Sequence, residues 1–228
     1  MKTHDVATSF SVERARRIQV CLSKKIILED KLPSRIKTVG GIDVAYLGDV
    51  AVGAAVVLDY SSLDLLECKL AVCKVMMPYV PTLLSFREVS PSLAAIRKLV
   101  LQPDIFIVDA QGYAHPYRCG FASYLGLAIK KPTIGAAKTR LLGEPVEKTG
   151  EILLSDKGEI IGSAVTTLEG AKPIYVSVGH MISLPTAVRI VKHCSKTRIP
   201  EPIVQAHRLA TTEKIRLGLE SKVNNAEA

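Results

Sequence analysis

The chain has 228 residues, a mass of 24.7 kDa and 48% hydrophobic residues, enough for a substantial core, which excludes a globally disordered protein. This length fits one α/β domain, and we expect residues 1–228 to form a single domain. The formal net charge is +8, with an isoelectric point near 9.3. Such a surplus favours a polyanionic partner such as nucleic acid over an acidic protein, although a merely basic soluble protein has the same composition.

The cysteine pattern and the hydropathy argue against a secreted or membrane protein. The five cysteines are odd in number and contain no CxxC pair, so we expect neither a disulfide framework nor a structural zinc site. No N-terminal segment resembles a signal peptide, and no apolar run is long enough to span a bilayer. We therefore expect a cytoplasmic protein with mostly buried thiols. The cysteines are Cys21, Cys68, Cys73, Cys119 and Cys194.

The first half of the chain predicts a helix, three strands and a second helix. Ser11 can cap a helix that runs to about Leu28, because apolar residues recur on one face. Three strand candidates then follow with short turn-like connections, which predicts an antiparallel meander. Ser90 and Pro91 are typical of the N-cap and first turn of a helix, which we expect to end near Leu101. The strands are expected at Thr38–Tyr46, Val50–Leu58 and Leu63–Val75.

The second half of the chain predicts alternating strands and helices. A short apolar strand, Ile105–Val108, precedes a helix rich in small residues over Cys119–Ile129. Ser183 is expected to cap the first of two C-terminal helices, and the second is expected to begin near Pro202. We expect Val223–Ala228 to be frayed. The remaining strands are expected at Thr133–Gly135, Glu151–Leu154, Ile160–Leu168 and Ile174–Val178.

Two aspartates stand in, or directly after, strongly apolar strands. Asp43 lies within the segment Gly40–Ala45, and Asp109 follows the first three residues of Phe106–Gly112. An unpaired carboxylate in apolar surroundings is strongly disfavoured unless a cation or another partner compensates its charge. A divalent metal shared by both residues is the simplest compensation. Each residue could instead be an exposed strand-end aspartate or a cap.

The order of the elements resembles that of the ribonuclease H-like fold, in which a three-strand meander is followed by alternating helices and strands. In that fold, catalytic carboxylates lie on the first strand, on or near the first helix after the meander, and on the fourth strand. Here Asp43 is on the first strand, Glu88 lies just before the predicted helix, and Asp109 ends the fourth strand. We therefore expect an α/β fold with a ribonuclease H-like mixed sheet flanked by helices.

Five blocks between positions 41 and 184 form a more specific pattern. They are Gly41–Tyr46, Pro78–Glu88, Val108–Pro116, Pro132–Lys138 and Ser177–Leu184. Together they resemble the endonuclease V family, nucleases that nick nucleic acid near deaminated purines. The Pro-Tyr-x-Pro segment that ends in Arg-Glu is the most specific feature. The sequence departs from the family at Thr82 and Ala110, where glycine is usual, and at Tyr117 and Met181, where arginine is common.

The resemblance implies a metal-dependent active site. Asp43, Glu88 and Asp109 would be catalytic and would bind Mg²⁺, for which Mn²⁺ can substitute, because hard cations prefer carboxylate oxygens. Lys138 would reach the scissile phosphate, and His180 would contact that phosphate or a nearby water. From the sequence alone, Glu88 could also be a solvated residue before a helix, Lys138 a surface lysine and His180 a core-edge histidine.

The resemblance also implies a wedge and a pocket for the altered base. Tyr79, in a stiff proline-rich loop, would enter the nucleic acid while the base leaves the stack, or it could be a core tyrosine. Hypoxanthine presents an O6 acceptor and an N1–H donor, whereas adenine presents the reverse pattern, and backbone groups can distinguish the two. The expected substrate-binding residues are Tyr79, Pro81, Thr82, Leu84, Ala110, Gln111, Gly112 and His115.

The implied function is DNA repair by a Mg²⁺-dependent endonuclease that recognises deoxyinosine. It would hydrolyse the second phosphodiester bond on the 3′ side, leaving 3′-hydroxyl and 5′-phosphate ends. An inosine-specific endoribonuclease is the alternative, because contacts to a 2′-hydroxyl cannot be read from the sequence. A catalytically silent nucleic-acid-binding module is a third hypothesis, but such a module would normally lack one of the three acids. We expect a monomer that binds inosine-containing nucleic acid and no membrane.

Overall fold

A mixed sheet of nine strands runs through the part of the chain that the structure describes. The computed structural model describes residues 11–148 and 150–226, with side chains described as far as residue 220. The strands are β1 (Thr38–Leu47), β2 (Val50–Asp59), β3 (Leu65–Lys74), β4 (Ile105–Val108), β5 (Thr133–Ala137), β6 (Glu144–Lys148), β7 (Glu151–Asp156), β8 (Glu159–Val165) and β9 (Ile174–His180). Their order in the sheet is β3-β2-β1-β4-β5-β9-β8-β7-β6. β4 pairs in parallel with β1 and β5, and the other neighbouring pairs are antiparallel.

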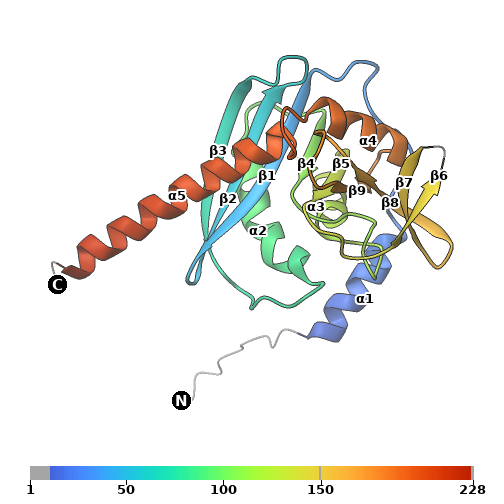
Figure 1. Cartoon of the computed structure of the whole chain (residues 1–228). Coiled ribbons are helices and arrows are strands. Elements are labelled where there is room, and N and C mark those ends of the chain that lie inside the picture. The colour runs from blue at the N-terminus through green and yellow to red at the C-terminus, as the bar shows by residue number, and fades with distance from the viewer. Residues whose placement is uncertain (1–10, 149, 227–228) are drawn as a thin grey trace.

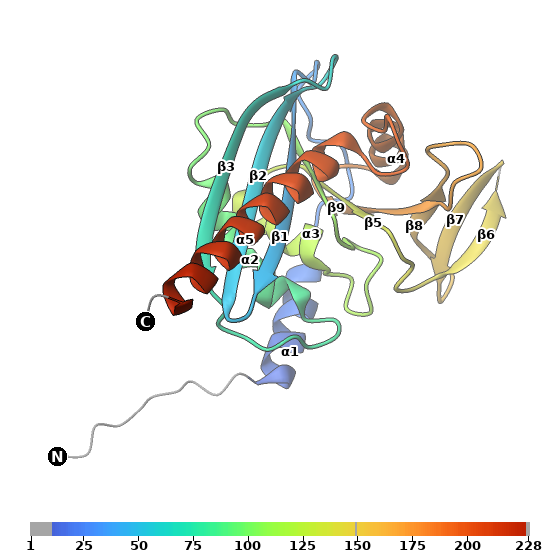
Figure 2. The same cartoon turned by 60° about the vertical axis from the view of Figure 1, so that its left-hand side comes forward.

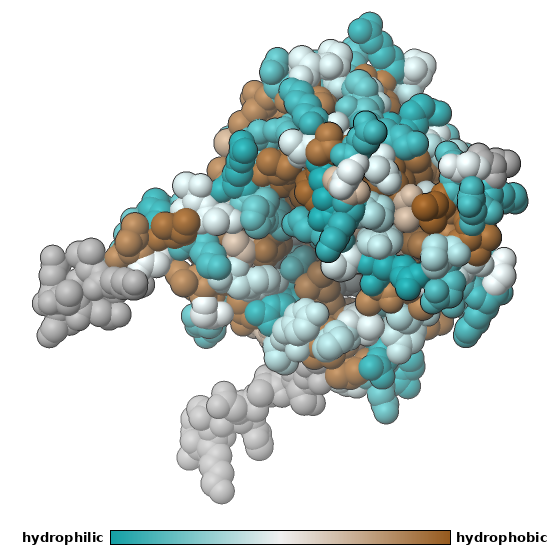
Figure 3. All heavy atoms as spheres, viewed as in Figure 1, coloured by the Kyte–Doolittle hydropathy of each residue, from teal (hydrophilic) through white to brown (hydrophobic). Residues whose placement is uncertain are grey.

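Helices cover both faces of this sheet (Figure 1). They are α1 (Val12–Ser23), α2 (Leu84–Ile96), α3 (Phe121–Ile129), α4 (Leu184–His193) and α5 (Glu201–Ala226). α5 crosses β1 and β2 on one face, where α4 packs on β8 and β9, while α2 and α3 lie on the opposite face. Figure 2 shows the C-terminal end of α5 projecting past the sheet, and the β6–β8 strands extending away on the other side. In Figure 3, hydrophilic residues cover much of the face that α5 crosses, with hydrophobic residues scattered between them.

Side chains of β1 and β4 alternate between two apolar layers, as the period of an extended strand requires. Val39 and Ile107 belong to the core under α4 and α5. Ile42 and Val108 belong to the core under α2 and α3. Each strand therefore presents every second residue to α5, and this alternation decides which face the acidic side chains take.

Two glycines allow helices to approach the sheet closely. A Cβ at Gly41 of β1 would lie 2.0 Å from the carbonyl oxygen of Pro202 in α5. A Cβ at Gly53 of β2 would lie 2.3 Å from the carbonyl oxygen of Pro91 in α2. Both obstacles are backbone atoms, which cannot swing aside as a flexible side chain can. The sheet is thus sandwiched between α5 and α2 at glycine contacts.

The first helix is shorter than the sequence predicts. α1 ends at Ser23, not near Leu28, because the following segment pairs with a distant part of the chain. The N–H of Met181 donates to the carbonyl oxygen of Ile27 at 2.8 Å, and the N–H of Lys31 donates to the carbonyl oxygen of Met181 at 3.0 Å. These long-range hydrogen bonds replace the helical ones that the local pattern favoured.

The second helix begins seven positions earlier than predicted, with Leu83 and not Ser90 as its N-cap. α2 starts at Leu84, ends at Ile96 and contains Pro91 in its interior. Proline cannot donate a helical hydrogen bond, so Ser90-Pro91 is typical of the first turn of a helix and not of its interior. Packing of the Pro91 turn against Gly53 favours the continuous helix instead. Glu88 therefore lies within this helix and not before it.

The remaining elements confirm the predicted α/β architecture, including the antiparallel meander and the ribonuclease H-like mixed sheet. One strand, β6, was not predicted, since its residues are all exposed and carry no apolar alternation. The expected fraying of the C-terminus from Val223 is wrong for Val223–Ala226, because α5 continues to Ala226. The last two positions of that prediction, 227–228, lie outside the described residues. The single-domain organisation stays a prediction. Within the described residues, no helix combines the length and apolar character needed to cross a membrane.

We predict that Gly41→Ala destabilises the protein, because its methyl group would collide with the backbone of α5. Overpacking of this kind costs about 1–3 kcal/mol or more, measurable by urea denaturation. Gly218→Ala is the matched control, since a Cβ at Gly218 would meet only the Leu47 side chain at 3.8 Å. Replacement of a helical glycine by alanine should stabilise by up to about 1 kcal/mol. Equal effects of the two substitutions would contradict the close contact.

Candidate active site

Asp43 and Asp109 lie side by side where β4 ends. Ile42 of β1 pairs in parallel with Val108 of β4, and the two aspartates are the next residues on their strands. Adjacent strands are about 4.8 Å apart. By the strand alternation, both carboxylates point to the face that α5 covers, and their side chains are only 17% and 15% exposed. Two acids from distant parts of the sequence are thus close enough to share one cation.

Glu88 adds a third carboxyl group from α2. Its burial, and after that the charges of Asp43 and Asp109, raise the pKa of Glu88 to about 8. Burial also raises the pKa of Asp43, with the charge of Asp109 adding to the effect and a hydrogen bond from His207 opposing it. The three carboxyl groups therefore repel one another in a partly desolvated site, which is the arrangement that a bound cation stabilises.

Two basic side chains border these acids. Lys138 directly follows β5, and its ammonium group donates a hydrogen bond to the Asp109 carboxylate. On the other side, Nδ1 of His207 in α5 lies 2.7 Å from Oδ2 of Asp43. The Lys138 and His207 side chains are 43% and 57% exposed, so both remain within reach of a substrate. Each of the two strand carboxylates thus has a basic hydrogen-bond partner that is partly exposed to solvent.

His207 was missed by the sequence analysis, and the contact of α5 with the sheet explains its position. Pro202 is held against Gly41, so the helix register at that point is fixed. Five residues of helix rise about 7.5 Å, and two residues of strand advance about 6.6 Å, which brings His207 level with Asp43. A lone histidine in a polar helix gives no local signal of this partnership.

The donor chemistry of the acids suits a hard divalent ion. Within the described ranges, no three His, Cys, Asp or Glu side chains form a ready-made metal-binding group. Magnesium is usually held by one or two carboxylates together with waters and substrate phosphates, and not by an all-protein cage. The adjacent carboxylates of Asp43 and Asp109, with Glu88 near enough to feel their charge, fit that description. A partner that brings phosphate would complete such a site.

The structure does not bring His180 to the acids. His180 pairs with Thr133 at the start of β5, whereas Lys138 lies just beyond the end of that strand, about 16 Å further along. The ring is 6% exposed, and its Nδ1 accepts a hydrogen bond from the N–H of Ile27 at 3.2 Å. The placement corresponds to the core-edge alternative, and we leave His180 out of the catalytic set.

A cavity of about 450 Å³ opens beside Asp109. Its volume lies in the range typical of ligand sites. Of the expected substrate-binding residues, two do not line it. Pro81 is exposed, and Gly112 packs behind the wall, where a Cβ would lie 2.2 Å from the Val178 carbonyl oxygen. The lining includes Tyr79, Thr82, Leu84, Ala110, Gln111 and His115, together with Asp109 and Lys138.

The two loops that form this cavity are joined at one carbonyl oxygen. Nε2 of the fully buried Gln19, in α1, donates to the carbonyl oxygen of Thr82 at 3.0 Å and to that of Cys119 at 3.0 Å. Nε2 of His115 lies 3.0 Å from the same Thr82 oxygen. Nδ1 of His115 accepts from the N–H of Tyr117, which places the ring proton on Nε2. Gln19 was not identified from the sequence, because its partners lie more than sixty residues away.

Thr82 adopts a backbone conformation that its side chain disfavours. Its φ is +71°, in the left-handed region where glycine is preferred and a β-branched residue is an outlier. The two hydrogen bonds to its carbonyl oxygen hold that conformation in place. The strain corresponds to the departure noted at this position, where the family usually has glycine.

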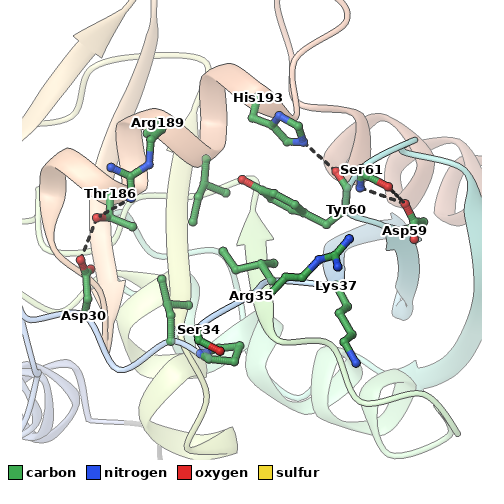
Figure 4. A pocket seen from close by; sticks show the side chains of 14 residues that line it. Asp30, Ser34, Arg35, Lys37, Asp59, Tyr60, Ser61, Thr186, Arg189 and His193 are labelled. Atoms are coloured by element: carbon green, nitrogen blue, oxygen red, sulfur yellow. Dashed lines mark hydrogen bonds between the residues drawn. The ribbon is translucent and has the colours of Figure 1, made fainter.

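A larger cavity, of about 840 Å³, lies away from the acids (Figure 4). It is bordered by the segment before β1, the turn after β2 and α4. The Asp30 carboxylate there accepts hydrogen bonds from the Ser183 N–H and the Thr186 hydroxyl. The Asp59 carboxylate accepts from the N–H and the hydroxyl of Ser61. These carboxylates are occupied in stabilising loops, so the smaller cavity beside Asp109 is the candidate reaction site.

The mixed sheet, with one carboxylate inside β1 and another at the end of β4, defines a nuclease of the ribonuclease H-like class. The Endonuclease V family model matches residues 21–208. The chain belongs to the endonuclease V family and is an enzyme, a metal-dependent hydrolase of phosphodiester bonds. Endonuclease V of Thermofilum pendens is 45% identical over 214 residues, which cover 92% of each chain. That of Archaeoglobus fulgidus is 39% identical over 216 residues, covering 93% of this chain and 98% of the relative.

Solved structures agree with the family assignment. Endonuclease V from Streptomyces avermitilis superposes with a TM-score of 0.83 at 37% identity, covering 93% of this chain and 95% of that one. Ciona intestinalis endonuclease V, in complex with a 24mer DNA containing an inosine followed by a ribo-adenosine, has a TM-score of 0.82 at 34% identity. That match covers 90% of this chain and 98% of the other. The predicted family and fold are therefore confirmed.

We predict a pH-dependent contribution of His115 to stability. Burial lowers the pKa of His115 to about 4, below its ordinary value of 6.5. Its stabilising contribution is therefore fully present above pH 6.5 and is lost as the pH falls towards 4, by up to about 3 kcal/mol. In urea denaturation, the stability difference between the wild type and His115→Gln should shrink steadily from pH 7 to pH 4. A constant difference over that range would refute the assignment.

Proposed function

We propose that this protein is a Mg²⁺-dependent endonuclease that recognises deoxyinosine in DNA. It hydrolyses the second phosphodiester bond on the 3′ side of the lesion, leaving 3′-hydroxyl and 5′-phosphate ends, and so begins DNA repair. The observation that carries the proposal is the adjacency of Asp43 and Asp109 beside a cavity of about 450 Å³. The inosine-containing DNA bound by the Ciona relative supports the choice of lesion.

Asp43, Glu88 and Asp109 would hold the Mg²⁺ ion, and Mn²⁺ can substitute for it. When bound, the ion supplies Lewis-acid stabilisation of phosphate charge and activation of water. Glu88, whose pKa is raised to about 8, can exchange a proton near neutral pH when the site is free of metal. The carboxylates also keep their shared face negative, which disfavours a phosphate unless cations accompany it.

Lys138 and His207 assist the reaction from their positions beside Asp109 and Asp43. Lys138 is bound to Asp109 and partly exposed, so its ammonium group can move to the oxygens of an arriving phosphate. His207 orients Asp43 through their hydrogen bond, and its ring is exposed to solvent. Both groups border the carboxylates, and Lys138 also lines the cavity beside Asp109, whereas His207 does not.

Tyr79 is the proposed wedge. Its side chain is 67% exposed although it is aromatic, and it lines the cavity beside Asp109. An exposed aromatic ring can stack in the space that a displaced base leaves. The net charge of +8 gives general attraction for the sugar–phosphate backbone. We further propose a cytoplasmic monomer. Of the described cysteines only Cys119 and Cys194 are buried, so the expectation of mostly buried thiols is wrong.

Inosine-containing RNA remains the alternative substrate. The DNA in the Ciona complex carries a ribonucleotide directly after the inosine, so a 2′-hydroxyl is accommodated at that position in the relative. We therefore propose that matched DNA and RNA strands with one inosine be compared with Mg²⁺ and with EDTA. Absence of cleavage on both strands would refute the nuclease proposal, and the preferred strand decides the substrate.

We predict that Asp43→Asn and Asp109→Asn each reduce cleavage of the preferred strand by roughly 10³-fold or more. Removal of one carboxylate from the metal site forfeits several kcal/mol of transition-state stabilisation. Each variant should unfold at a urea concentration close to that of the wild type, because neither side chain is part of the apolar core. Residual activity close to the wild-type rate in either variant would contradict the metal-site assignment.

We predict that Tyr79→Ala weakens binding of the inosine strand by about tenfold, because one stacking contact is worth about 1–3 kcal/mol. Binding of an undamaged strand should change less, since its bases stay stacked. The measurement is fluorescence anisotropy with labelled strands in EDTA, with thermal stability as the fold control. Unchanged affinity for the inosine strand would remove the wedge role.

A further inference from the structure

The pairing of β5 with β9 ends one residue before Lys138. The last pair of this antiparallel ladder is Ala137 with Tyr175. By the same register, Thr139 would face Pro173, which has no N–H group to donate to a neighbouring strand. The ladder therefore stops short of Lys138, and the position of the Lys138 backbone depends on other contacts.

Arg198 supplies hydrogen-bond donors at this point, from the connection between α4 and α5. Its Nη2 donates to the carbonyl oxygen of Lys138 at 2.9 Å and to that of Pro173 at 3.1 Å. Its Nε donates to the carbonyl oxygen of Lys172 at 2.9 Å. A guanidinium group is planar and holds its N–H donors in a fixed fork. This one group thus bridges the chain that leaves β5 and the chain that enters β9, beyond the last backbone pair.

The segment that carries Arg198 is itself fixed on both sides. The carbonyl oxygen of Arg198 accepts a hydrogen bond from the Thr167 hydroxyl at 2.7 Å. Three residues later α5 begins at Glu201, whose N–H donates to the carbonyl oxygen of Cys194 at 2.7 Å. The guanidinium therefore extends from a defined backbone, which allows it to define the position of another.

A second side chain holds the carbonyl group that follows. Nε2 of Gln111 donates to the carbonyl oxygen of Thr139 at 2.9 Å. Lys138 and Thr139 are thus held from two separate parts of the chain. The lysine side chain is a flexible four-carbon stem, so its ammonium group can be placed accurately only when its backbone is fixed. In the structure that ammonium group donates a hydrogen bond to the Asp109 carboxylate.

We propose that Arg198 is a positioning residue for the reaction. It fixes the backbone of Lys138 so that the ammonium group meets Asp109 and the phosphate that enters the site. This inference rests on the proposed function and deepens it. The guanidinium donates to backbone carbonyl oxygens, so its effect on the reaction passes through Lys138. A displacement of about 1 Å at a reacting group can cost about 10²-fold in rate, which sets the scale of the expected loss.

A double-mutant cycle tests this coupling. The four proteins are the wild type, Arg198→Met, Lys138→Met and the double variant, and the measurement is the single-turnover cleavage rate of the preferred inosine strand with Mg²⁺. Arg198→Met should slow the wild type about tenfold, and Lys138→Met should slow it roughly 10²-fold. In the Lys138→Met background, Arg198→Met should slow cleavage less than about twofold, because no ammonium group is left to position. Equal factors in the two backgrounds would overturn the inference.

Arg189→Met is the matched control. The Arg189 guanidinium also donates a hydrogen bond, to the Thr186 hydroxyl, but it lies at the larger cavity away from the acids (Figure 4). This variant should keep the wild-type rate within about twofold. If Arg198→Met does not fold, the cycle is repeated with Arg198→Lys, which keeps the charge but not the fork of donors. A folded Arg198→Lys that cleaves at the wild-type rate would also overturn the inference.

The same cycle separates this inference from the proposed function. Equal factors together with a slow Lys138→Met variant overturn only the positioning role of Arg198. A wild-type rate in Lys138→Met would refute the proposed contact of that lysine with the phosphate, and the positioning role with it. Absence of cleavage by the wild type would refute the proposed function, on which the inference rests.

Discussion

The parallel register between β1 and β4 is the constraint on which the rest of the site depends. It sets Ile42 beside Val108, and so places Asp43 beside Asp109 on one face of the sheet. A shift of one residue in either strand would turn one carboxylate into the opposite apolar core. The backbone hydrogen bonds of the sheet thus supply the energy that holds two like charges together. Burial, and after it the charge of neighbouring carboxylates, raises the pKa of Asp43 and of Glu88.

The same face of the sheet explains why the last helix belongs to the active site. The absence of a side chain at Gly41 lets the backbone of α5 rest on β1 at Pro202. One and a half helical turns later, His207 reaches Asp43. The helix thus packs against the sheet at Pro202 and forms a hydrogen bond with it at His207. Distance in sequence is therefore no guide to membership of the site.

The cavity beside Asp109 is formed by several loops that hydrogen bonds hold together, and not by one element. Gln19 in α1 ties the Thr82 loop to the start of α3, and His115 ties the same carbonyl oxygen to the loop after β4. These donors hold Thr82 in a conformation that its own side chain disfavours. The cavity thus has a rigid frame.

The amino-acid sequence by itself determined the meander, the order of the elements and the two aspartates in apolar strands. These are local patterns, and a carboxylate after an apolar run is visible without any partner. Only the tertiary structure decided that α2 runs through Pro91, that His207 joins Asp43 and that His180 stands apart. In each case the deciding factor was a contact between segments distant in the chain. Such a contact either outweighed the local pattern or supplied information that the pattern lacked. Periodicity reports which residues a segment buries, whereas the meeting of two segments depends on strand register and helix approach, which no single segment encodes.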